Sequence, residues 1–249
     1  MRPIGFSTGA LAYSDFRRGL EILRDKRTAT IELSALREAE LAPLVAALDS
    51  LDLSPYNYVS VHAPSKYQEG REAEILDLLR RVTSHGWPIV LHPDVIHNVA
   101  AWNSFGSLLL IENMDKRNNF GRTARELSDI FEKLPQAGLC FDMGHCRQVD
   151  PTMNESYLIL RDLGDRLRQV HLSDVNSRST HDPLSSSSID AFEKVACLIP
   201  ENIPVILESP VQEKDVEQEI EQARFALPVP PSSGDRGKIL STTLHRAIA

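Results

Sequence analysis

Short apolar segments recur along the whole chain, and this recurrence constrains the fold more than any other feature. There are eight such segments, each rich in Val, Ile, Leu or Phe and bounded by turn-forming residues, which predicts eight β-strands. The segments show no clean alternation of polar and apolar residues, which is typical of strands covered on both faces. The predicted strands are residues 4–7, 29–33, 58–62, 88–92, 108–112, 138–142, 167–171 and 204–208.

Helical patterns lie between most of the predicted strands. Thr123 to Glu126 has the form of a capping box, whereas Asp94 to Trp102 predicts only a short or irregular helix. Alternating strands and helices imply right-handed crossovers and a parallel sheet, and eight units are the number that closes into a barrel. We therefore predict the α/β class and a single-domain (β/α)8 TIM barrel, with an open doubly wound sheet as the alternative. The predicted helices are residues 14–26, 35–48, 71–83, 123–134, 154–163, 187–199 and 214–226.

The end of the chain differs in composition from the rest. Residues 1–226 carry the strand and helix patterns, and the segment that starts at Pro228 is rich in Pro, Ser and Gly, as linkers are. We therefore predict a barrel domain over residues 1–226 and a C-terminal tail over 227–249. Packing of the tail across the bottom of the barrel stays open.

The charge and the cysteine content limit the possible partners and compartment. A net charge of −8 and a pI of 5.5 argue against nucleic acid as a partner and favour a small-molecule substrate. The three cysteines form no CxxC pair, no cleavable leader is visible, and no apolar run approaches the roughly 20 residues of a membrane span. We expect a cytoplasmic protein without membrane contact, and a homodimer stays open.

Titratable side chains gather at the ends of the predicted strands. In a barrel of parallel strands, these ends meet at one mouth, where active sites lie. Crowded carboxylates and imidazoles repel one another or stay unsatisfied unless a cation binds them, so we predict a divalent metal. The strand-end residues are Glu32, His62, His92, Glu112, Asp142, His171 and Glu208, and the loop residues are His145, Asp174 and His181.

Several of these residues also have a simpler interpretation. A single His after a strand often only bonds to its own loop, and Glu32 would fit a buried carboxylate that pairs with an Arg. Arg178 fits either a surface charge or a substrate anchor. We expect Trp87 and Trp102 to be packing residues. Solvated loop or tail groups are expected at Asp94, His97 and His245.

The strand-end motifs, in this order and spacing, resemble the xylose-isomerase-like TIM-barrel superfamily, from Ile4 to about Pro210. This superfamily includes sugar isomerases and epimerases as well as endonuclease IV-like phosphodiesterases. The motifs are Ser-Val-His62-Ala-Pro, Leu-His92-Pro, Ile-Glu112-Asn-Met, Asp142-Met-Gly-His145, His171-Leu-Ser-Asp174 and Leu-Glu208-Ser-Pro.

The isomerase branch of this resemblance implies a single divalent metal, commonly manganese, cobalt or magnesium. Its implied ligands are Glu112, Asp142, His171 and Glu208. Glu112 and Glu208 would also move a proton between neighbouring carbons through an enediolate. The resemblance thus implies an isomerase or epimerase that acts on a sugar, a sugar phosphate or a related polyol ketone.

The endonuclease IV branch implies two or three ions, zinc or iron, and is the alternative. It would add His62, His92, His145 and His181 as metal or substrate residues, with Asp174 and Arg178 as further candidates. This chain departs from the branch at two places, because Ser179 replaces an expected Asp and residues 185–188 replace a Gly-Glu-Gly turn. The missing Asp argues against a third ion, and the missing glycines argue against a loop that approaches the substrate closely. A non-catalytic binding barrel is the remaining alternative.

Overall fold

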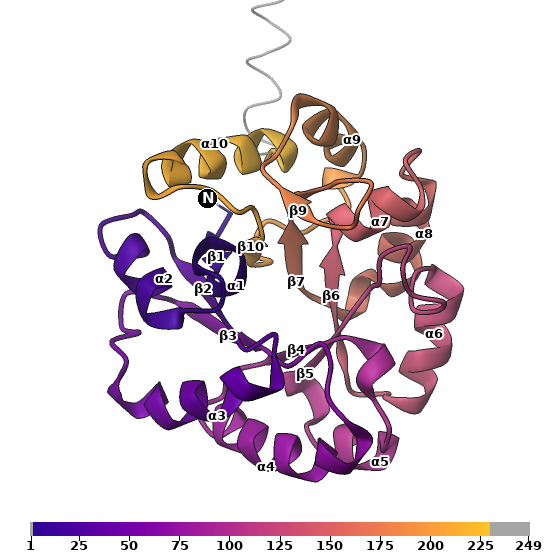
Figure 1. The fold of residues 1–249 in the computed structure, drawn as a ribbon. Helices are drawn as coiled ribbons and strands as arrows, with labels where there is room; N and C mark the ends of the chain where they lie inside the picture. Colours follow the sequence, from indigo (N-terminus) through magenta and orange to yellow (C-terminus); the bar gives the residue numbers. More distant parts are fainter. Residues whose placement is uncertain (1, 230–249) are drawn as a thin grey trace, which may run out of the picture.

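Eight parallel strands close into a barrel in this computed structural model, which describes residues 2–229 (Figure 1). Around the barrel the strands follow the order β1-β10-β7-β6-β5-β4-β3-β2, so the prediction of a single-domain TIM barrel is confirmed and the open sheet is excluded. Their bounds are β1 Ile4–Ser7, β2 Thr30–Ser34, β3 Tyr58–His62, β4 Ile89–Leu91, β5 Leu109–Glu112, β6 Gly138–Asp142, β7 Leu167–Leu172 and β10 Val205–Leu207.

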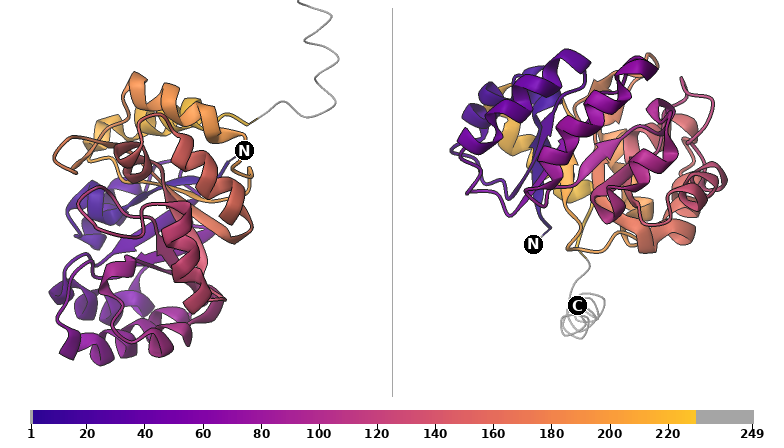
Figure 2. Two further views of the ribbon diagram at one scale, coloured as in Figure 1. Left: turned by 90° about the vertical axis from the view of Figure 1, so that its right-hand side faces the viewer. Right: turned by 90° about the horizontal axis from the view of Figure 1, so that it is seen from below.

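A ring of helices surrounds the strands, and the two further views in Figure 2 show them on the outside of the barrel. The seven helical patterns of the sequence are confirmed as α2 Phe16–Leu23, α3 Glu38–Ala47, α4 Glu72–Thr83, α6 Ala124–Lys133, α8 Asn154–Leu163, α9 Ser186–Ala196 and α10 Val216–Ala226. The segment after β4 is irregular, as predicted, with a 3-10 turn over Pro93–Val95 and the short α5 over Val99–Asn103. Further 3-10 turns lie at Leu48–Ser50, Glu69–Arg71, Gly106–Leu108, Gly164–Arg166 and Glu213–Asp215.

Three short elements near the barrel mouth were not predicted. They are helix α1 over Thr8–Ala12, helix α7 over Met143–Val149, and a hairpin of β8 (Asp174–Val175) with β9 (His181–Asp182). Each has at most seven residues, too few to show a helical or strand period in the sequence. Met143 and Gly144, which directly follow Asp142, thus open α7 rather than forming a turn.

The main apolar core joins side chains of the strands and of the surrounding helices, and the fully buried Trp102 belongs to it. The indole nitrogen of Trp102 donates to Glu72 Oε1 at 2.7 Å, so this Trp is a packing residue, as expected. No helix within residues 2–229 is long and apolar enough to cross a membrane.

Helix α10 ends at Ala226, the last residue of the predicted barrel domain. The tail prediction for residues 227–249 falls mostly outside the described residues, as does His245. The division at residue 226 therefore stays a prediction.

Candidate metal centre

Four side chains from neighbouring strands converge at the barrel mouth. Ligand atoms of Glu112, Asp142, His171 and Glu208 all lie within 4.8 Å of one another, and the four residues are almost completely buried. Parallel pairing explains this convergence, because β5, β6 and β7 end side by side and the register sets Asp142 opposite His171. The four residues named from the sequence thus form one group.

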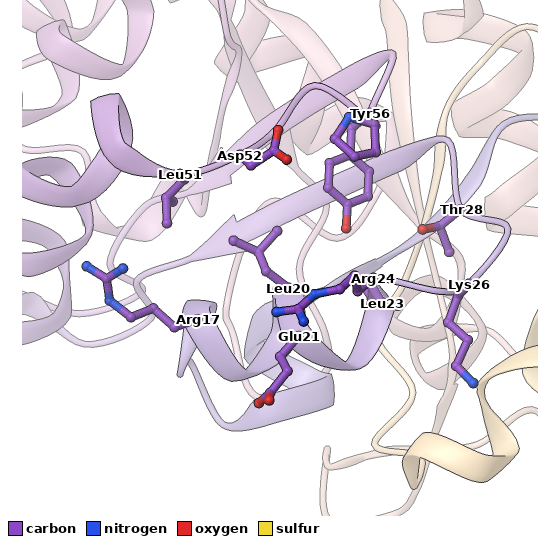
Figure 3. Close-up of a pocket in the computed structure, with 11 residues that line it drawn as sticks. Arg17, Leu20, Glu21, Leu23, Arg24, Lys26, Thr28, Leu51, Asp52 and Tyr56 are labelled. Carbon is purple, nitrogen blue, oxygen red and sulfur yellow. The ribbon is translucent and has the colours of Figure 1, made fainter.

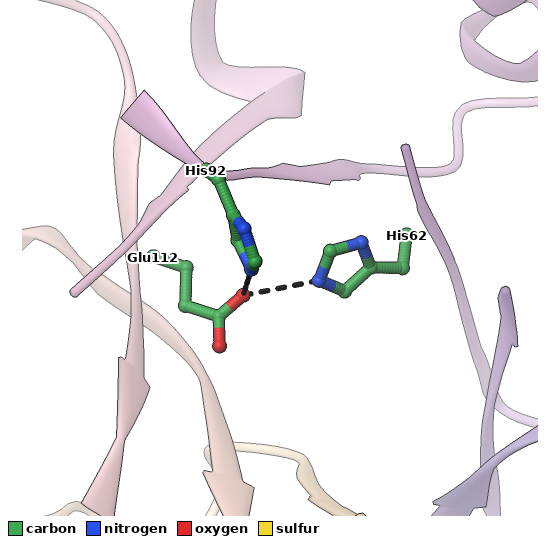
Figure 4. Close-up of side chains that lie close together, drawn as sticks. All are labelled: His62, His92 and Glu112. Atoms are coloured by element: carbon green, nitrogen blue, oxygen red, sulfur yellow. Dashed lines mark hydrogen bonds and ion pairs between the residues drawn. The ribbon is translucent and has the colours of Figure 1, made fainter. Parts of the chain in front are cut away.

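A second group of potential ligands shares Glu112 with the first. Figure 4 shows His62 and His92 pointing at the same carboxylate oxygen of Glu112. His62 Nε2 lies 3.1 Å and His92 Nε2 lies 3.2 Å from Glu112 Oε2, whereas His171 Nδ1 lies 3.2 Å from Oε1. The two oxygens of Glu112 therefore face different groups.

Helix α7 places His145 beside the first group. Asp142 caps this helix, since its Oδ1 accepts from the backbone N–H of His145 at 2.6 Å. His145 Nδ1 lies 3.1 Å from Asn113 O and 3.5 Å from Asp142 Oδ2. His145 is therefore held by the main chain of Asn113 and by the cap.

A cavity of about 280 Å³ opens above these residues. Its polar wall includes both ligand groups through His62, His92, Glu112 and Glu208, together with His145 and His181. His181 Nδ1 lies 2.8 Å from Ser173 Oγ and 3.7 Å from Glu208 Oε2. All five histidines that the sequence assigned to the mouth are therefore at the mouth.

Asp174 and Arg178 lie outside both ligand groups and outside the cavity wall. The carboxylate of Asp174 pairs with Arg147 at 2.6 Å and accepts from Ser185 at 2.5 Å. Arg178 is exposed on the β8–β9 hairpin and lies outside the residues that line the described cavity. Ser179, at the position of the expected Asp, donates to Gln148 Oε1 at 2.9 Å, so it supplies no charged ligand.

Glu32 does not pair with an Arg, which was its simpler interpretation. Its Oε2 lies 3.0 Å from His171 Nε2 and accepts from Gln169 Nε2 at 2.7 Å. Glu32 is fully buried below the first ligand group.

The carboxylates of the two groups differ in their protonation. Burial would raise the pKa of Glu112, but His171 and His92 more than offset it and hold the pKa well below its ordinary value. Burial raises the pKa of Glu208 to about 8, and the negative charge of Glu112 and Asp142 adds to this rise. His171 opposes it.

The pKa values of the imidazoles are shifted in opposite directions. The carboxylates around His171 raise its pKa well above the ordinary value although burial lowers it. Burial lowers the pKa of His181 to about 4, so this ring stays neutral at physiological pH. His181 can therefore offer a lone pair to a cation or a hydrogen bond to a ligand.

The donor sets fit divalent cations. The Oδ2 atom of Asp142 is buried and has no hydrogen-bond partner within the described residues, which leaves a carboxylate oxygen free for a cation. Three carboxylates with one imidazole suit manganese or magnesium, and two imidazoles with one carboxylate suit zinc or iron.

A second cavity of about 280 Å³ lies away from the barrel mouth (Figure 3). It is lined by α2 and by the segments that lead into β2 and β3, with Arg17, Leu20 and Tyr56 among its residues. None of the residues that line it belongs to either ligand group. The candidate centre is therefore the cavity at the mouth.

The closed barrel and the acid and imidazole groups at its mouth define a class of protein: a TIM barrel with a candidate metal site. A family model described as "Xylose isomerase-like TIM barrel" matches residues 99–225. The chain belongs to this family, as the resemblance predicted. A comparison with curated proteins gave no match.

Solved structures share the fold at low sequence identity. Endonuclease IV from Thermus thermophilus is 17% identical, with a TM-score of 0.61 over 91% of this chain and 99% of the other. A xylose isomerase-like TIM barrel protein from Mycobacterium smegmatis, in complex with magnesium, is 12% identical, with a TM-score of 0.56 over 91% and 98%. The probable 3-DHS dehydratase from Bacillus anthracis is 13% identical, with a TM-score of 0.59 over 92% and 100%.

Sequence reasoning missed three residues around the site. Asn113 braces Asp142, since its Nδ2 donates to Asp142 O at 2.8 Å and its Oδ1 accepts from Asp142 N at 2.7 Å. Tyr13 and Arg117 line the cavity. Of these three residues, only Asn113 could have been assigned to the site from the sequence, because it directly follows the strand-end residue Glu112.

Proposed function

We propose that this chain is a metal-dependent hydrolase of small phosphoesters that holds two divalent cations at the barrel mouth. The observation that carries this proposal is that the two carboxylate oxygens of Glu112 face different side chains: Oε2 faces His62 and His92, and Oε1 faces His171. A carboxylate in this position can bridge two cations. Divalent cations held there would neutralise a phosphoryl group and lower the pKa of a water molecule, as hydrolysis requires.

The residues of this chain would divide the work as follows. His62 and His92, with Glu112, would hold one cation, zinc or iron by their donor types. Glu112 would also join Asp142, His171 and Glu208 around the other. His145 and His181 line the cavity and would contact the phosphoryl oxygens.

The size and charge of the site support a small substrate. A cavity of about 280 Å³ is just below the usual size range of ligand pockets, which begins at about 300 Å³. The net charge of −8 opposes long-range attraction of a nucleic acid backbone. We therefore propose a phosphoester of monosaccharide or mononucleotide size rather than duplex DNA.

Isomerisation or epimerisation of a sugar, sugar phosphate or related polyol ketone is the second candidate, and Glu208 favours it. This carboxyl lines the cavity, and its pKa of about 8 lets it hold or release a proton near neutral pH. Glu112 would be the second catalytic carboxylate, and a single manganese, cobalt or magnesium ion would sit in the first ligand group.

The test is an assay panel of phosphomonoesters, phosphodiesters and ketoses on protein supplied with zinc, iron, manganese or cobalt. We expect the rate of phosphoester cleavage to fall more than about 100-fold in His62→Ala, because this change removes one of the three ligands of the second ligand group. His97→Ala is the matched control, since His97 is exposed and lies outside both groups. Ketose isomerisation that survives His62→Ala would support the second candidate, and no turnover on any substrate would leave a binding barrel.

A further inference from the structure

A buried polar layer lies beneath the candidate metal centre, and His171 connects the two. His171 and Glu32 are both fully buried. On its upper side, His171 Nδ1 lies 3.2 Å from Glu112 Oε1 and 3.5 Å from Glu208 Oε2. On its lower side, His171 Nε2 lies 3.0 Å from Glu32 Oε2.

The position of one hydrogen on His171 decides whether this ring can bind a cation. A neutral imidazole carries a hydrogen on one nitrogen and a lone pair on the other. Only a lone pair on Nδ1 can face a cation held by Glu112 and Glu208. The hydrogen must then be on Nε2, and Nε2 needs an acceptor.

Gln169 would favour the opposite position for this hydrogen, on Nδ1 of His171. Its Nε2 lies 2.8 Å from His171 Nε2, and an amide N–H there could donate to a bare imidazole nitrogen. Tyr58 fixes the orientation of this amide, since the Tyr58 hydroxyl donates to Gln169 Oε1 at 2.8 Å. With the amide held this way, Gln169 can only donate toward His171. Without a competing acceptor, it would drive the hydrogen of His171 onto Nδ1.

Glu32 is the competing acceptor. Its Oε2 accepts from Gln169 Nε2 at 2.7 Å and from Ser60 Oγ at 3.3 Å. The other hydrogen of the Gln169 amide can go to Cys140 Sγ at 3.7 Å, so both amide hydrogens have an acceptor other than His171. A buried carboxylate requires donors, and no Arg or Lys is among its hydrogen-bond or ion-pair partners in residues 2–229. The Nε2–H of His171 is the remaining strong donor.

We infer that Glu32 is a positioning residue: it holds the hydrogen of His171 on Nε2, which turns the Nδ1 lone pair toward the cation position. This inference rests on the cation site of the proposed function, but the hydrogen position can be observed without a cation. A carboxylate that accepts from a metal-binding His fixes the ring and raises its basicity. Glu32 thus links β2 to a ligand on β7.

The experiment reads the hydrogen position directly from histidine ring ¹⁵N spectra of the wild type, with and without Zn²⁺. We expect a hydrogen on Nε2 of His171 in both spectra. Nδ1 also carries a hydrogen, toward Glu112 Oε1, in the first spectrum and is bound to Zn²⁺ in the second. In Glu32→Leu, which removes the acceptor at similar volume, we expect the hydrogen on Nδ1. We also expect Zn²⁺ binding about 10- to 100-fold weaker than in the wild type.

Two further variants separate the possible causes. Glu32→Gln keeps an oxygen acceptor without the charge, so His171 should keep its hydrogen on Nε2 and lose less Zn²⁺ affinity than in Glu32→Leu. Ser60→Ala is the matched control, because it removes a 3.3 Å contact to the same oxygen without a contact to His171. It should change neither the spectrum nor the affinity.

A bare Nε2 on wild-type His171 would overturn the inference, and so would unchanged affinity in a folded Glu32→Leu variant. The wild-type spectrum decides even if Glu32→Leu does not fold. Failure of the proposed function gives a different result: the hydrogen is on Nε2, but Zn²⁺ does not bind.

Discussion

At the scale of single residues, Glu112 connects most of the groups at the barrel mouth. It contacts His62, His92 and His171, and it is 1% exposed. Such an ionised carboxylate has no access to water, so its charge must be balanced by the imidazoles or by cations. Under the proposed function, both cations depend on this one side chain.

Glu112→Gln should therefore remove both cations. The amide keeps the shape, but it loses the negative charge that both groups share and one of the two acceptor oxygens. Elemental analysis after loading and desalting should give no bound cation. Glu217→Gln, on the exposed face of α10, is the control and should bind as the wild type does. Retention of either cation by Glu112→Gln would contradict the bridging role.

His181→Ala should leave the number of bound cations at two. His181 lies in the cavity wall, but Ser179 offers no carboxylate beside it and donates to Gln148 instead. We expect slower phosphoester cleavage with unchanged metal content, measured on one protein preparation. Loss of a cation from this variant would show that His181 is a ligand.

The strand-end residues could be predicted from the sequence because each follows directly on a strand, and strand length then fixes its position. Glu112, Asp142 and His171 are examples, and their convergence follows from parallel pairing alone. The partner of Glu32 could not be predicted, because His171 and Gln169 are far from it in sequence and meet it only inside the closed barrel. The pairing of Asp174 with Arg147 could not be predicted either, because the hairpin that carries Asp174 has too few residues to show a pattern.

At the scale of elements, α7 positions both a candidate ligand and a cavity residue. Asp142 caps the helix and belongs to the first ligand group, and His145 lies in its first turn. The helix packs closely on the segment after β7, where a Cβ at Gly144 would lie 2.6 Å from Val175 Cγ2 and 2.8 Å from Ser173 O. Only glycine fits this contact.

Gly144→Ala should therefore destabilise the protein. The overlap forces α7 away from its support, at a cost of about 1–3 kcal/mol in the free energy of unfolding. Gly164→Ala is the matched control, because its Cβ would meet nothing within 4 Å and its φ of −58° suits any residue. Urea unfolding of both variants checks this, and equal stability would contradict the close approach of α7.

Helix α6 depends on its capping box in a way the sequence predicted. Thr123 Oγ1 accepts from Glu126 N at 3.2 Å, and Glu126 Oε2 accepts from Thr123 N at 3.1 Å. Thr123→Ala should cost about 1 kcal/mol in the free energy of unfolding, and Thr123→Ser should restore most of it. Two variants of equal stability in urea unfolding would count against the cap.

At the scale of the whole molecule, the proposed function couples the barrel and the candidate metal centre energetically. The strands carry Glu32, Glu112, Asp142 and His171 into a buried space, where the carboxylates repel one another. Cations bound there would remove this repulsion, and they would bind the folded chain rather than the unfolded one. The architecture itself was predictable from the sequence, since eight buried runs separated by helices leave few other ways to close a sheet.

Metal binding should consequently raise the melting temperature. A cation at 100 times its Kd adds about 2.7 kcal/mol per site to the stability of the folded state. Thermal unfolding with a chelator and with added Zn²⁺ or Mn²⁺ should show this shift in the wild type and not in Glu112→Gln. An equal shift in both proteins would place the cations elsewhere.

The number of cations per chain tests the two-ion centre most directly. Native mass spectrometry of metal-supplied protein should give two cations per wild-type chain and one per His62→Ala chain, because His62 belongs only to the second ligand group. One cation in both proteins, or none in the wild type, would contradict a centre bridged by Glu112.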